Sequence, residues 1–327
     1  MKKFPLFEIT MLSMCSKRTC SWIKAFRVRR NAFEIKVVSY IEKTVYLCNE
    51  PEKEKLRFNI TSTMSEEMRE SVKIGDSGFQ MSIEETKELL SEKSIIYPIR
   101  MYMENQIEGL KVVSEYLCSL FEINISSICL LPDSNTNDQI SIIEWATKHQ
   151  KRFQKLSFDC NRMNDTAAEF ILSKINQAVD VFICFKTSPS FKTNLKFEGQ
   201  SLLFRVSNWF SLENLLSINC SELHVNESKL TNIDMNSFLK HWISRDLKFK
   251  KMSILMMEVV KYDDLFNGIP FEKRTNDVER VYHDFYGPRT ISGGYDIKRN
   301  DGMIATIVPQ RTHIENEFFT MIVWDKQ

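Results

Sequence analysis

Residues 209–243 change their hydrophobic period twice, and this change limits the fold more than any other feature of the chain. The first part carries leucines at the three- and four-residue spacing of one helical face: Leu212, Leu215 and Leu216. In residues 222–226, apolar and polar side chains alternate instead, as they do on the two faces of a strand. The segment therefore predicts a helix, a strand and a second helix, which is the building unit of an α/β protein.

The second helix of this segment has a start signal and an apolar face. Thr231 and Asp234 have the spacing of a capping box, with Asp in place of Glu, so the helix should begin near Asn232. The apolar side chains that follow share one face: Phe238, Leu239, Trp242 and Ile243. We therefore expect this helix to pack against a core and to bury Trp242.

Strand-like runs recur between residues 128 and 256, with helical patterns in most of the intervals. The runs are residues 128–131, 156–160, 181–185, 202–206, 223–225 and 252–256, and the helical intervals are 139–149, 167–175, 211–218 and 232–243. The runs are separated by about 20 to 30 residues, the period of leucine-rich repeats. The predicted fold class is α/β, with a leucine-rich-repeat-like body of parallel strands and helices. The alternative is an ordinary open α/β sheet, because the spacing is irregular.

Antiparallel patterns lie on the N-terminal side of this body and at the C-terminus. Residues 33–60 contain alternating runs separated by a turn at 49–54, which predicts a small β segment. Residues 295–308 form two extended runs around Asn300-Asp-Gly302, a strong hairpin signal, and residues 317–324 supply a third strand. Residues 61–94 are rich in Ser, Glu and Lys, which predicts a linker with one helix at 83–90.

Several longer runs contain residues that are specific enough to identify a family. They are residues 219–221 (NCS), 228–232 (SKLTN) and 236–243 (NSFLKHWI), with further matches at 131–134, 137–138, 143–145 and 293–302. These runs resemble the F-box-associated domain, type 2, of the nematode F-box protein family. The resemblance covers most of the chain from about residue 90 onward. It implies a module like the substrate-binding part of an F-box adaptor of a cullin-RING ubiquitin ligase, with a protein substrate as partner.

The first 32 residues resemble an F-box whose middle is missing. Residues 4–7 (FPLF) and 12–19 (LSMCSKRT) match its opening and closing parts, and only residues 8–11 join them. The positions that remain for a Skp-type adaptor are Phe4, Pro5, Leu6, Leu12 and Met14, and without the intervening helix they should lack a scaffold. The alternative is that residues 11–26 are simply one amphipathic helix. The resulting domains are 1–32, an F-box remnant; 33–60, a β segment; 61–94, a linker; and 95–327, the F-box-associated domain.

Composition narrows the classes of partner and compartment. Lys and Arg number 44 against 43 acidic residues, so no global field attracts nucleic acid or an anionic membrane, and a protein partner is expected. No apolar run approaches the roughly 20 residues that span a bilayer, and residues 1–8 are interrupted too soon for a signal peptide. The eight cysteines include no CxxC pair, which favours reduced thiols. An intracellular location, in the cytoplasm or nucleus, is predicted.

A protein-binding or structural role outside ubiquitin ligation, in a chain that has lost adaptor docking, is the alternative function.

The sequence contains no catalytic or metal-binding motif. The five histidines form no HExxH pattern, and no GxSxG or papain-like cysteine context occurs. Residues 292–294 (SGG) precede a strand rather than a helix, which indicates a turn and not a phosphate loop. The chain is therefore expected not to be an enzyme and to need no cofactor or metal.

The expected partner surface is the open face of the strands. Polar side chains there alternate with core residues, and in a repeat-like scaffold such a face recognises partners: Ser157, Asp159, Arg205, Ser207, His224 and Asn226. The alternative is that they are solvated strand residues without a binding role.

Overall fold

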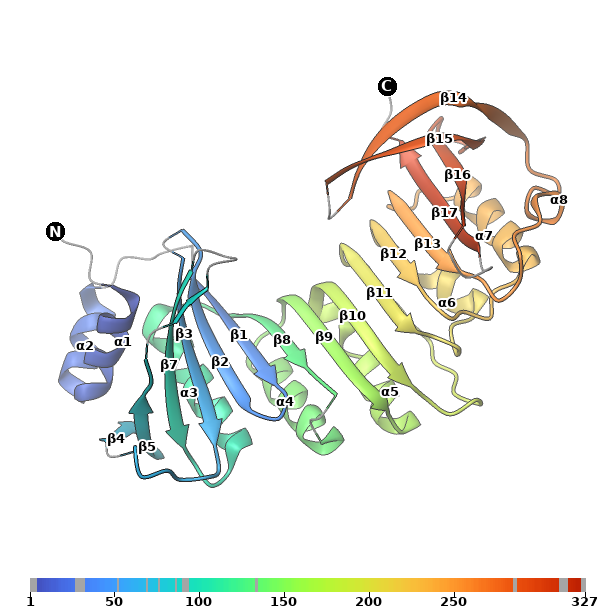
Figure 1. Cartoon of the computed structure of the whole chain (residues 1–327). Coiled ribbons are helices and arrows are strands. Elements are labelled where there is room, and N and C mark those ends of the chain that lie inside the picture. The colour runs from blue at the N-terminus through green and yellow to red at the C-terminus, as the bar shows by residue number, and fades with distance from the viewer. Residues whose placement is uncertain are drawn as a thin grey trace. The chain divides into compact units, whose positions relative to one another are not determined.

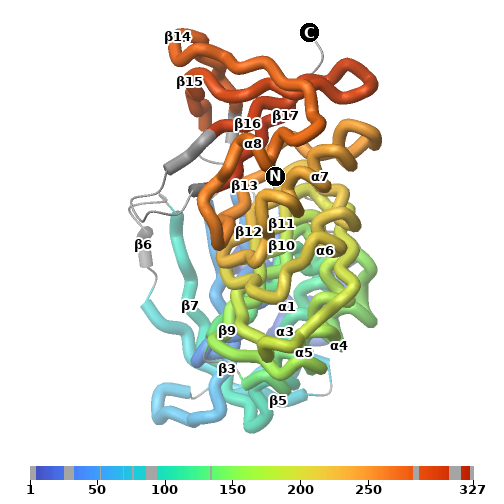
Figure 2. Tube along the Cα trace, turned by 90° about the vertical axis from the view of Figure 1, so that its right-hand side faces the viewer, coloured from blue at the N-terminus to red at the C-terminus, as the bar shows by residue number. Residues whose placement is uncertain are grey.

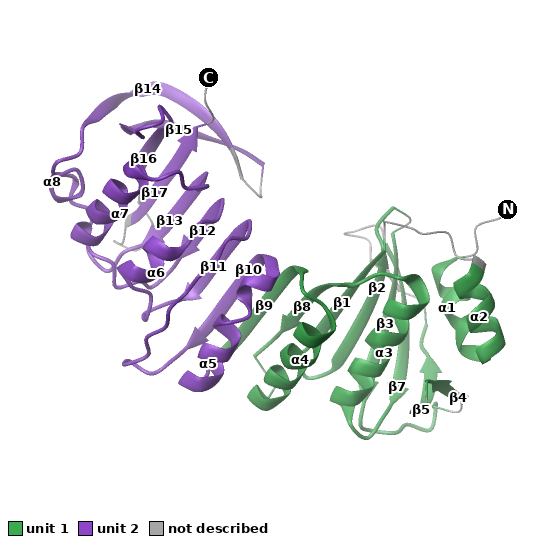
Figure 3. Ribbon diagram, turned by 180° about the vertical axis from the view of Figure 1, so that it is seen from behind, with its two compact units in different colours: residues 1–160 green, residues 161–327 purple. Residues whose placement is uncertain are grey.

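The structure is a computed structural model that divides into two compact units, residues 1–160 and 161–327 (Figure 3). It describes residues 5–26, 33–51, 53–68, 70–75, 77–85, 87–89, 94–132, 135–284, 287–311 and 317–324. The expected boundary at residues 94–95 lies inside unit 1. The reason is that the strand beginning at Ser94 pairs with the strand that ends at Thr61, so both belong to one sheet.

Unit 1 is built on a mixed sheet whose strands lie in the order β7–β3–β2–β1–β8–β9. Their bounds are β1 (Phe33–Ser39), β2 (Lys43–Asn49), β3 (Glu54–Thr61), β7 (Ser94–Tyr102), β8 (Ile125–Leu130) and β9 (Phe153–Arg162). β1, β2 and β3 form the predicted antiparallel segment, and β8 runs parallel to both β1 and β9. Two helices join the later strands, α3 (Gln106–Phe121) and α4 (Thr136–His149). α3 has no counterpart among the predicted helices.

The described part of residues 61–94 forms strands and not a linker. It contains β4 (Glu70–Ile74), β5 (Ser77–Ile83) and β6 (Lys87–Leu89), and β5 and β6 both pair with β7. The helix expected at 83–90 is wrong for the same reason. Ile74, Phe79 and Met81 are buried, so three apolar side chains outweigh the polar composition that predicted a linker.

The N-terminal segment is a pair of helices, α1 (Leu6–Cys15) and α2 (Lys17–Phe26), rather than the single helix over residues 11–26 of the alternative interpretation. The chain is extended at Ser16, with φ −161° and ψ 156°. The Ser16 hydroxyl accepts a hydrogen bond of 3.0 Å from the backbone N–H of Thr19, which caps the start of α2. A break with its own cap explains why one amphipathic stripe becomes two helices.

Unit 2 contains the predicted run of parallel strands. β10 (Ala178–Lys186), β11 (Ser201–Val206), β12 (Glu222–Val225) and β13 (Lys251–Leu255) lie side by side in chain order. α5 (Asp165–Leu172) and a 3-10 turn, η1 (Ile175–Gln177), precede β10, while α6 (Leu212–Ser217) and α7 (Asn232–Ser244) connect the later strands. Figure 2 shows α6 and α7 on one side of these strands. A mixed α/β fold is thus confirmed, and the leucine-rich-repeat-like regularity stays a prediction.

The C-terminal part of unit 2 is an antiparallel meander, as predicted. After α8 (Tyr262–Leu265) come β14 (Phe271–Asp284), β15 (Gly287–Lys298), β16 (Ile304–Arg311) and β17 (Glu317–Trp324) (Figure 1). β17 pairs antiparallel with β13, so the sheet continues from the parallel strands into the order β17–β16–β15–β14. Gly302 has a positive φ of 94° in the turn between β15 and β16. β14 has no counterpart among the predicted strands.

α7 forms as its sequence indicates. The Thr231 side chain accepts from the Asp234 N–H while the Asp234 carboxylate accepts from the Thr231 N–H, so the capping box is confirmed. Phe238, Leu239 and Trp242 are fully buried on the face that packs into the core of unit 2.

Candidate functional site

The candidate site is the open face of unit 2, the side of its sheet opposite the buried side chains of β10–β13. One row of neighbouring residues crosses this face from strand to strand: Phe182, Leu203, His224, Ser253 and Thr320. The first three, on β10, β11 and β12, are half-buried, whereas Ser253 and Thr320 are buried. The face is therefore accessible on its parallel strands and covered where it reaches β17.

A folded-over hairpin covers that second part. We define the arm as residues 279–284 of β14 and 287–292 of β15. Its Tyr282 and Ile291 pack against Val308 of β16 and Ile322 of β17. The ammonium group of Lys251, on β13, lies 5.2 Å from the centre of the Tyr282 ring, a cation–π contact. The arm thus forms a wall beside the accessible part of the open face.

The bend that folds the arm over depends on two glycines. The register of β14 and β15 shifts between Arg274 and Glu279, and Gly293 and Gly294 opposite this shift have φ of 69° and 105°. A Cβ at Gly294 would lie 2.7 Å from the Thr306 side chain and 2.9 Å from the Ile307 carbonyl oxygen. Only glycine fits there. The predicted turn at 292–294 is therefore a bend within β15.

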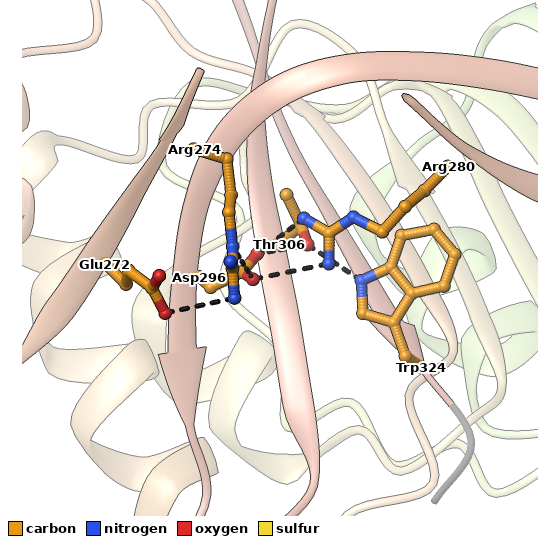
Figure 4. A network of polar contacts seen from close by, with 6 residues as sticks. All are labelled: Glu272, Arg274, Arg280, Asp296, Thr306 and Trp324. Carbon is orange, nitrogen blue, oxygen red and sulfur yellow. Dashed lines mark hydrogen bonds and ion pairs between the residues drawn. The ribbon is translucent and has the colours of Figure 1, made fainter. Parts of the chain in front are cut away.

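A buried carboxylate joins the arm to the rest of the sheet. Asp296 is 6% exposed, and Figure 4 shows it between the guanidinium groups of Arg274 and Arg280. Arg274 donates to it at 2.9 Å and Arg280 at 2.8 and 3.3 Å, while the Thr306 hydroxyl donates at 2.6 Å. The Trp324 indole N–H in turn donates to Thr306 at 2.7 Å, and the Arg280 guanidinium lies 4.9 Å from the Trp324 ring centre. Arg280 belongs to the arm, so this network ties the arm to β15, β16 and β17.

The electrostatics of Asp296 follow from these contacts. Burial by itself raises the pKa of the carboxyl group, but hydrogen bonds from Arg280, Thr306 and Arg274 favour the charged form and outweigh burial. The pKa of Asp296 is therefore lowered, and the carboxylate stays ionised at neutral pH.

His224 lies at the centre of the open face. Its ring centre is 5.7 Å from that of Phe318, at the start of β17. Burial lowers the pKa of His224, Asn226 acts in the opposite direction, and the positive charge of Lys251 lowers it further. The imidazole is consequently neutral at neutral pH and presents an uncharged, aromatic surface.

This lowered pKa predicts a stability that depends on pH. The folded chain binds a proton at His224 less readily than the unfolded chain, whose histidine has an ordinary pKa of about 6.5. The free energy of unfolding should therefore fall as the pH is lowered below about 6.5, until the folded pKa is reached. Urea titrations of the wild type and a His224→Gln variant, between about pH 7 and pH 5, should show a shallower fall in the variant. Identical pH profiles would contradict the assignment.

The structure places four of the six predicted face residues in unit 2. Arg205 is exposed, and His224 and Asn226 are half-buried beside it on β12 and its end. Ser207 is fully buried, and its hydroxyl donates to the Asn226 carbonyl, so its expected place on the open face is wrong. β11 ends at Val206, after a register shift, and the strand alternation does not extend to Ser207.

The other two predicted residues lie on β9 of unit 1. Asp159 is half-buried, while Ser157 is buried beside the Cys129 thiol of β8. Both side chains point away from the core residues Leu156 and Phe158, as the alternation predicts. Ser157 offers little surface to a partner.

Several residues of the open face have no counterpart among the predicted ones. They are half-buried apolar side chains: Phe182, Leu203, Leu255 and Phe318. The runs 181–185 and 202–204 are apolar throughout, a pattern typical of strands buried on both faces. One face is covered by helices and the other stays partly open, which a continuous apolar run does not reveal.

The segment predicted to be an F-box remnant packs into unit 1. Leu6 and Met14 are buried, Pro5 is half-buried, Leu12 is 47% exposed, and Phe4 lies outside the described residues. The Phe7 ring stacks on Tyr97 of β7 at 4.8 Å, and the Leu6 N–H donates to the Glu54 carboxylate of β3 at 3.1 Å. The expectation that these positions lack a scaffold is wrong, because strands of unit 1 supply one.

The part of the chain that the structure describes contains neither a cluster of metal ligands nor a membrane-spanning helix. No three His, Cys, Asp or Glu side chains there converge on a metal site, and no described helix has the length and apolar character to cross a bilayer. Cys48, Cys160 and Cys220 are buried and form no disulfide. The burial of Cys220 raises its pKa to about 12, so this thiol stays protonated.

These features define an α/β protein with a mixed sheet, one partly open sheet face and a hairpin folded over part of it. Residues 190–265 match the family model described as "F-box associated". This match agrees with the resemblance seen in the sequence, over the segment that it covers. The segment contains β11, α6, β12, α7, β13 and α8, and hence Arg205, His224 and Asn226 of the open face.

Two proteins of Caenorhabditis elegans are similar to the chain. An uncharacterized protein is 20% identical over 325 residues, which cover 98% of this chain and 74% of that protein. The Skn-1 dependent zygotic transcript 15 protein is 24% identical over 225 residues, which cover 63% of this chain and 61% of that protein. No solved structure matches the chain.

Proposed function

We propose that the chain is a protein-recognition module that resembles the substrate-binding part of an F-box adaptor, and that its partner binds the open face of unit 2. The observation that carries the proposal is the position of the family match. Residues 190–265 supply β11, β12 and β13, and with them Leu203, Arg205 and His224. The segment that relates the chain to the family therefore includes three of the strands that form the face.

The composition of this face suits a protein partner. Aromatic side chains and arginine are enriched where proteins bind one another, and they carry much of the binding energy. Phe182, Phe318 and the neutral His224 ring supply aromatic area, and Arg205 stands exposed at the edge. The arm closes one side, so an occupant would contact a floor and a wall. The proposal assigns binding alone, with no catalysis and no cofactor.

Charge reversal on the face should weaken binding while leaving the fold intact. For Arg205→Glu and for His224→Ala we expect at least a tenfold loss of affinity for a partner recovered by affinity purification, a change of about 1.4 kcal/mol. Lys240→Glu is the matched control, because Lys240 is exposed on α7, on the helical side of unit 2. The melting temperatures of Arg205→Glu and the control should match that of the wild type. Undiminished binding by both face variants would refute the proposed location.

Asp159→Lys tests the unit 1 strand separately. Of the two predicted positions on β9, Asp159 is charged and half-buried, whereas Ser157 is uncharged and buried. If this variant alone lowers the affinity for the partner, recognition depends on unit 1, and the open face of unit 2 loses its assigned role.

A second candidate function is protein binding outside ubiquitin ligation. The burial of Leu6 and Met14 in unit 1 favours it, because these side chains are then unable to contribute to an adaptor interface of roughly 800 Å² per partner. The experiment is affinity purification of the full chain from cells, followed by identification of the proteins in the eluate. A cullin and a Skp-type adaptor in the eluate support the ubiquitin-ligase role, and a partner recovered without them supports the alternative. Either role places the protein inside the cell.

A further inference from the structure

Unit 1 contains a groove that has no role in the function proposed above for the open face of unit 2. It has a volume of about 800 Å³ and lies where the α1–α2 pair meets the β4–β5 hairpin and α3 (Figure 1). We call it the α2 groove, and its described lining comes from residues within 13–24, 71–75 and 112–119, together with Ser77. This volume falls within the range of about 300–1,000 Å³ that is usual for ligand sites.

The charge in the α2 groove is positive. Lys17 and Lys24 of α2 and Lys73 of β4 line it, against Glu115 as the one acidic residue among the described residues of the lining. The Glu115 carboxylate already accepts a hydrogen bond from the Trp145 indole at 2.7 Å, and the Nε2 atom of His149 lies 3.0 Å from the same carboxylate. Within the described residues, none of the three lysines forms an ion pair with a carboxylate. The described lining therefore carries three ammonium groups against one carboxylate.

The remaining lining combines hydroxyl groups with an apolar floor. Serine side chains are frequent in the groove: Ser16, Ser21, Ser71, Ser77 and Ser119. Lys24 donates to the Ser119 hydroxyl at 2.6 Å, which holds its ammonium group at the rim. Met14 and Ile74 are buried beneath, with Val72 and Val112 half-buried beside them. The groove can thus donate several hydrogen bonds to an anion and contact apolar atoms next to it.

From these features we infer that the α2 groove binds a phosphate monoester carried on a peptide, a phosphoserine or phosphothreonine side chain. A phosphate monoester has a charge of about −1.5 to −2 and three strong acceptor oxygens, which match three lysines and several hydroxyl donors better than a single carboxylate does. The groove is larger than a free phosphate ion requires, and its apolar floor suits the side chains that flank a modified residue. The inference goes beyond the proposed function, since it concerns another surface and another ligand.

The test measures binding of N-acetyl-O-phosphoserine amide and of inorganic phosphate to the full chain. Line broadening in phosphorus NMR reports binding directly, and a rise in melting temperature with ligand concentration reports it through mass action. The groove variant is Lys17→Gln with Lys73→Gln, and the matched control is Lys148→Gln with Lys151→Gln. All four lysines are exposed in unit 1, and the control pair lies outside the groove.

We expect saturable binding of the phosphoserine compound to the wild type and the control, and at least tenfold weaker binding to the groove variant. Added salt should weaken binding, since it screens exposed charges. The melting temperature without ligand verifies that the groove variant is folded. Equal binding by the groove variant and the wild type overturns the site. The absence of saturable binding to the wild type overturns the ligand class, and inorganic phosphate that binds as tightly as the phosphoserine compound overturns its peptide origin.

Discussion

Replacement of Trp242 by alanine is expected to lower the free energy of unfolding by about 3–5 kcal/mol. The indole is fully buried in unit 2, on the same face of α7 as Phe238 and Leu239. Alanine would leave a cavity the size of most of an indole, which the surrounding core can fill only in part. The guanidinium of Arg299 lies 5.4 Å from the indole ring centre and is itself 5% exposed, so the variant also removes a cation–π contact from a buried charge.

Lys240→Ala is the control on the same helix, because Lys240 is exposed and should change the free energy of unfolding by no more than about 0.5 kcal/mol. Urea titrations of both variants provide the comparison. Trp242→Phe is a smaller change. The indole N–H has no hydrogen-bond partner among the described residues, so this substitution leaves no acceptor without its donor. Similar small effects of Trp242→Ala and Lys240→Ala would show that α7 does not bury the face assigned to it.

The elements that the sequence predicts well are those whose signals are local. The capping box of Thr231 and Asp234 lies within four residues, and the leucines that define α6 lie within five. The strands β10, β11 and β13 stand out as short, mainly apolar runs, and β12 stands out by its alternation between two helical patterns. Their parallel order follows from connections long enough to cross over the sheet.

The elements that the sequence does not predict depend on contacts between distant residues. β14 has a sequence of alternating charges, FEKRTNDVERVYHD, with few apolar positions to mark a strand. It is a strand because β15 pairs with it, and no local propensity requires this. The same holds for β4 and β5, where the burial of Ile74, Phe79 and Met81 against the rest of unit 1 decides the structure.

The candidate site also has one part that the sequence predicts and one part that it does not. Alternation along single strands correctly placed Arg205, His224 and Asn226 away from the core. The arm could not be predicted, because it requires Arg280 to meet Asp296 across a bend, and Tyr282 and Ile291 to reach Val308 and Ile322. These contacts join four strands, and their geometry depends on the positive φ of Gly293 and Gly294.

The Asp296 network has a structural consequence for the open face. Tyr282 and Ile291 of the arm supply only a small apolar contact to β16 and β17, so charge interactions must hold the arm in place as well. Arg280 is the residue of the arm that reaches the buried carboxylate, and Arg274 approaches it from the other side of the bend. Loss of the charge at Asp296 should therefore loosen the wall of the proposed site before it affects the parallel strands.

Asp296→Asn is expected to lower the free energy of unfolding by about 2–3 kcal/mol and to increase amide hydrogen exchange in the arm, residues 279–284 and 287–292. Removal of one partner from a buried ion pair typically costs about 3–5 kcal/mol, and the smaller figure applies here because Arg274 and Arg280 are 33% and 24% exposed and remain partly solvated. Glu272→Gln is the control within the same network: Glu272 pairs with Arg274 at 3.0 Å but is 66% exposed, so its loss should cost about 0–1 kcal/mol.

Since the folded pKa of Asp296 is lowered, the contribution of this carboxylate to stability is present above the ordinary pKa of about 3.9 and is lost as the pH falls through the folded value. The difference between wild type and variant should accordingly persist at neutral pH and shrink in acid. If Asp296→Asn and Glu272→Gln prove equally mild, and the arm amides exchange no faster in the Asp296 variant, then apolar contacts alone hold the arm and the network is not what positions the wall.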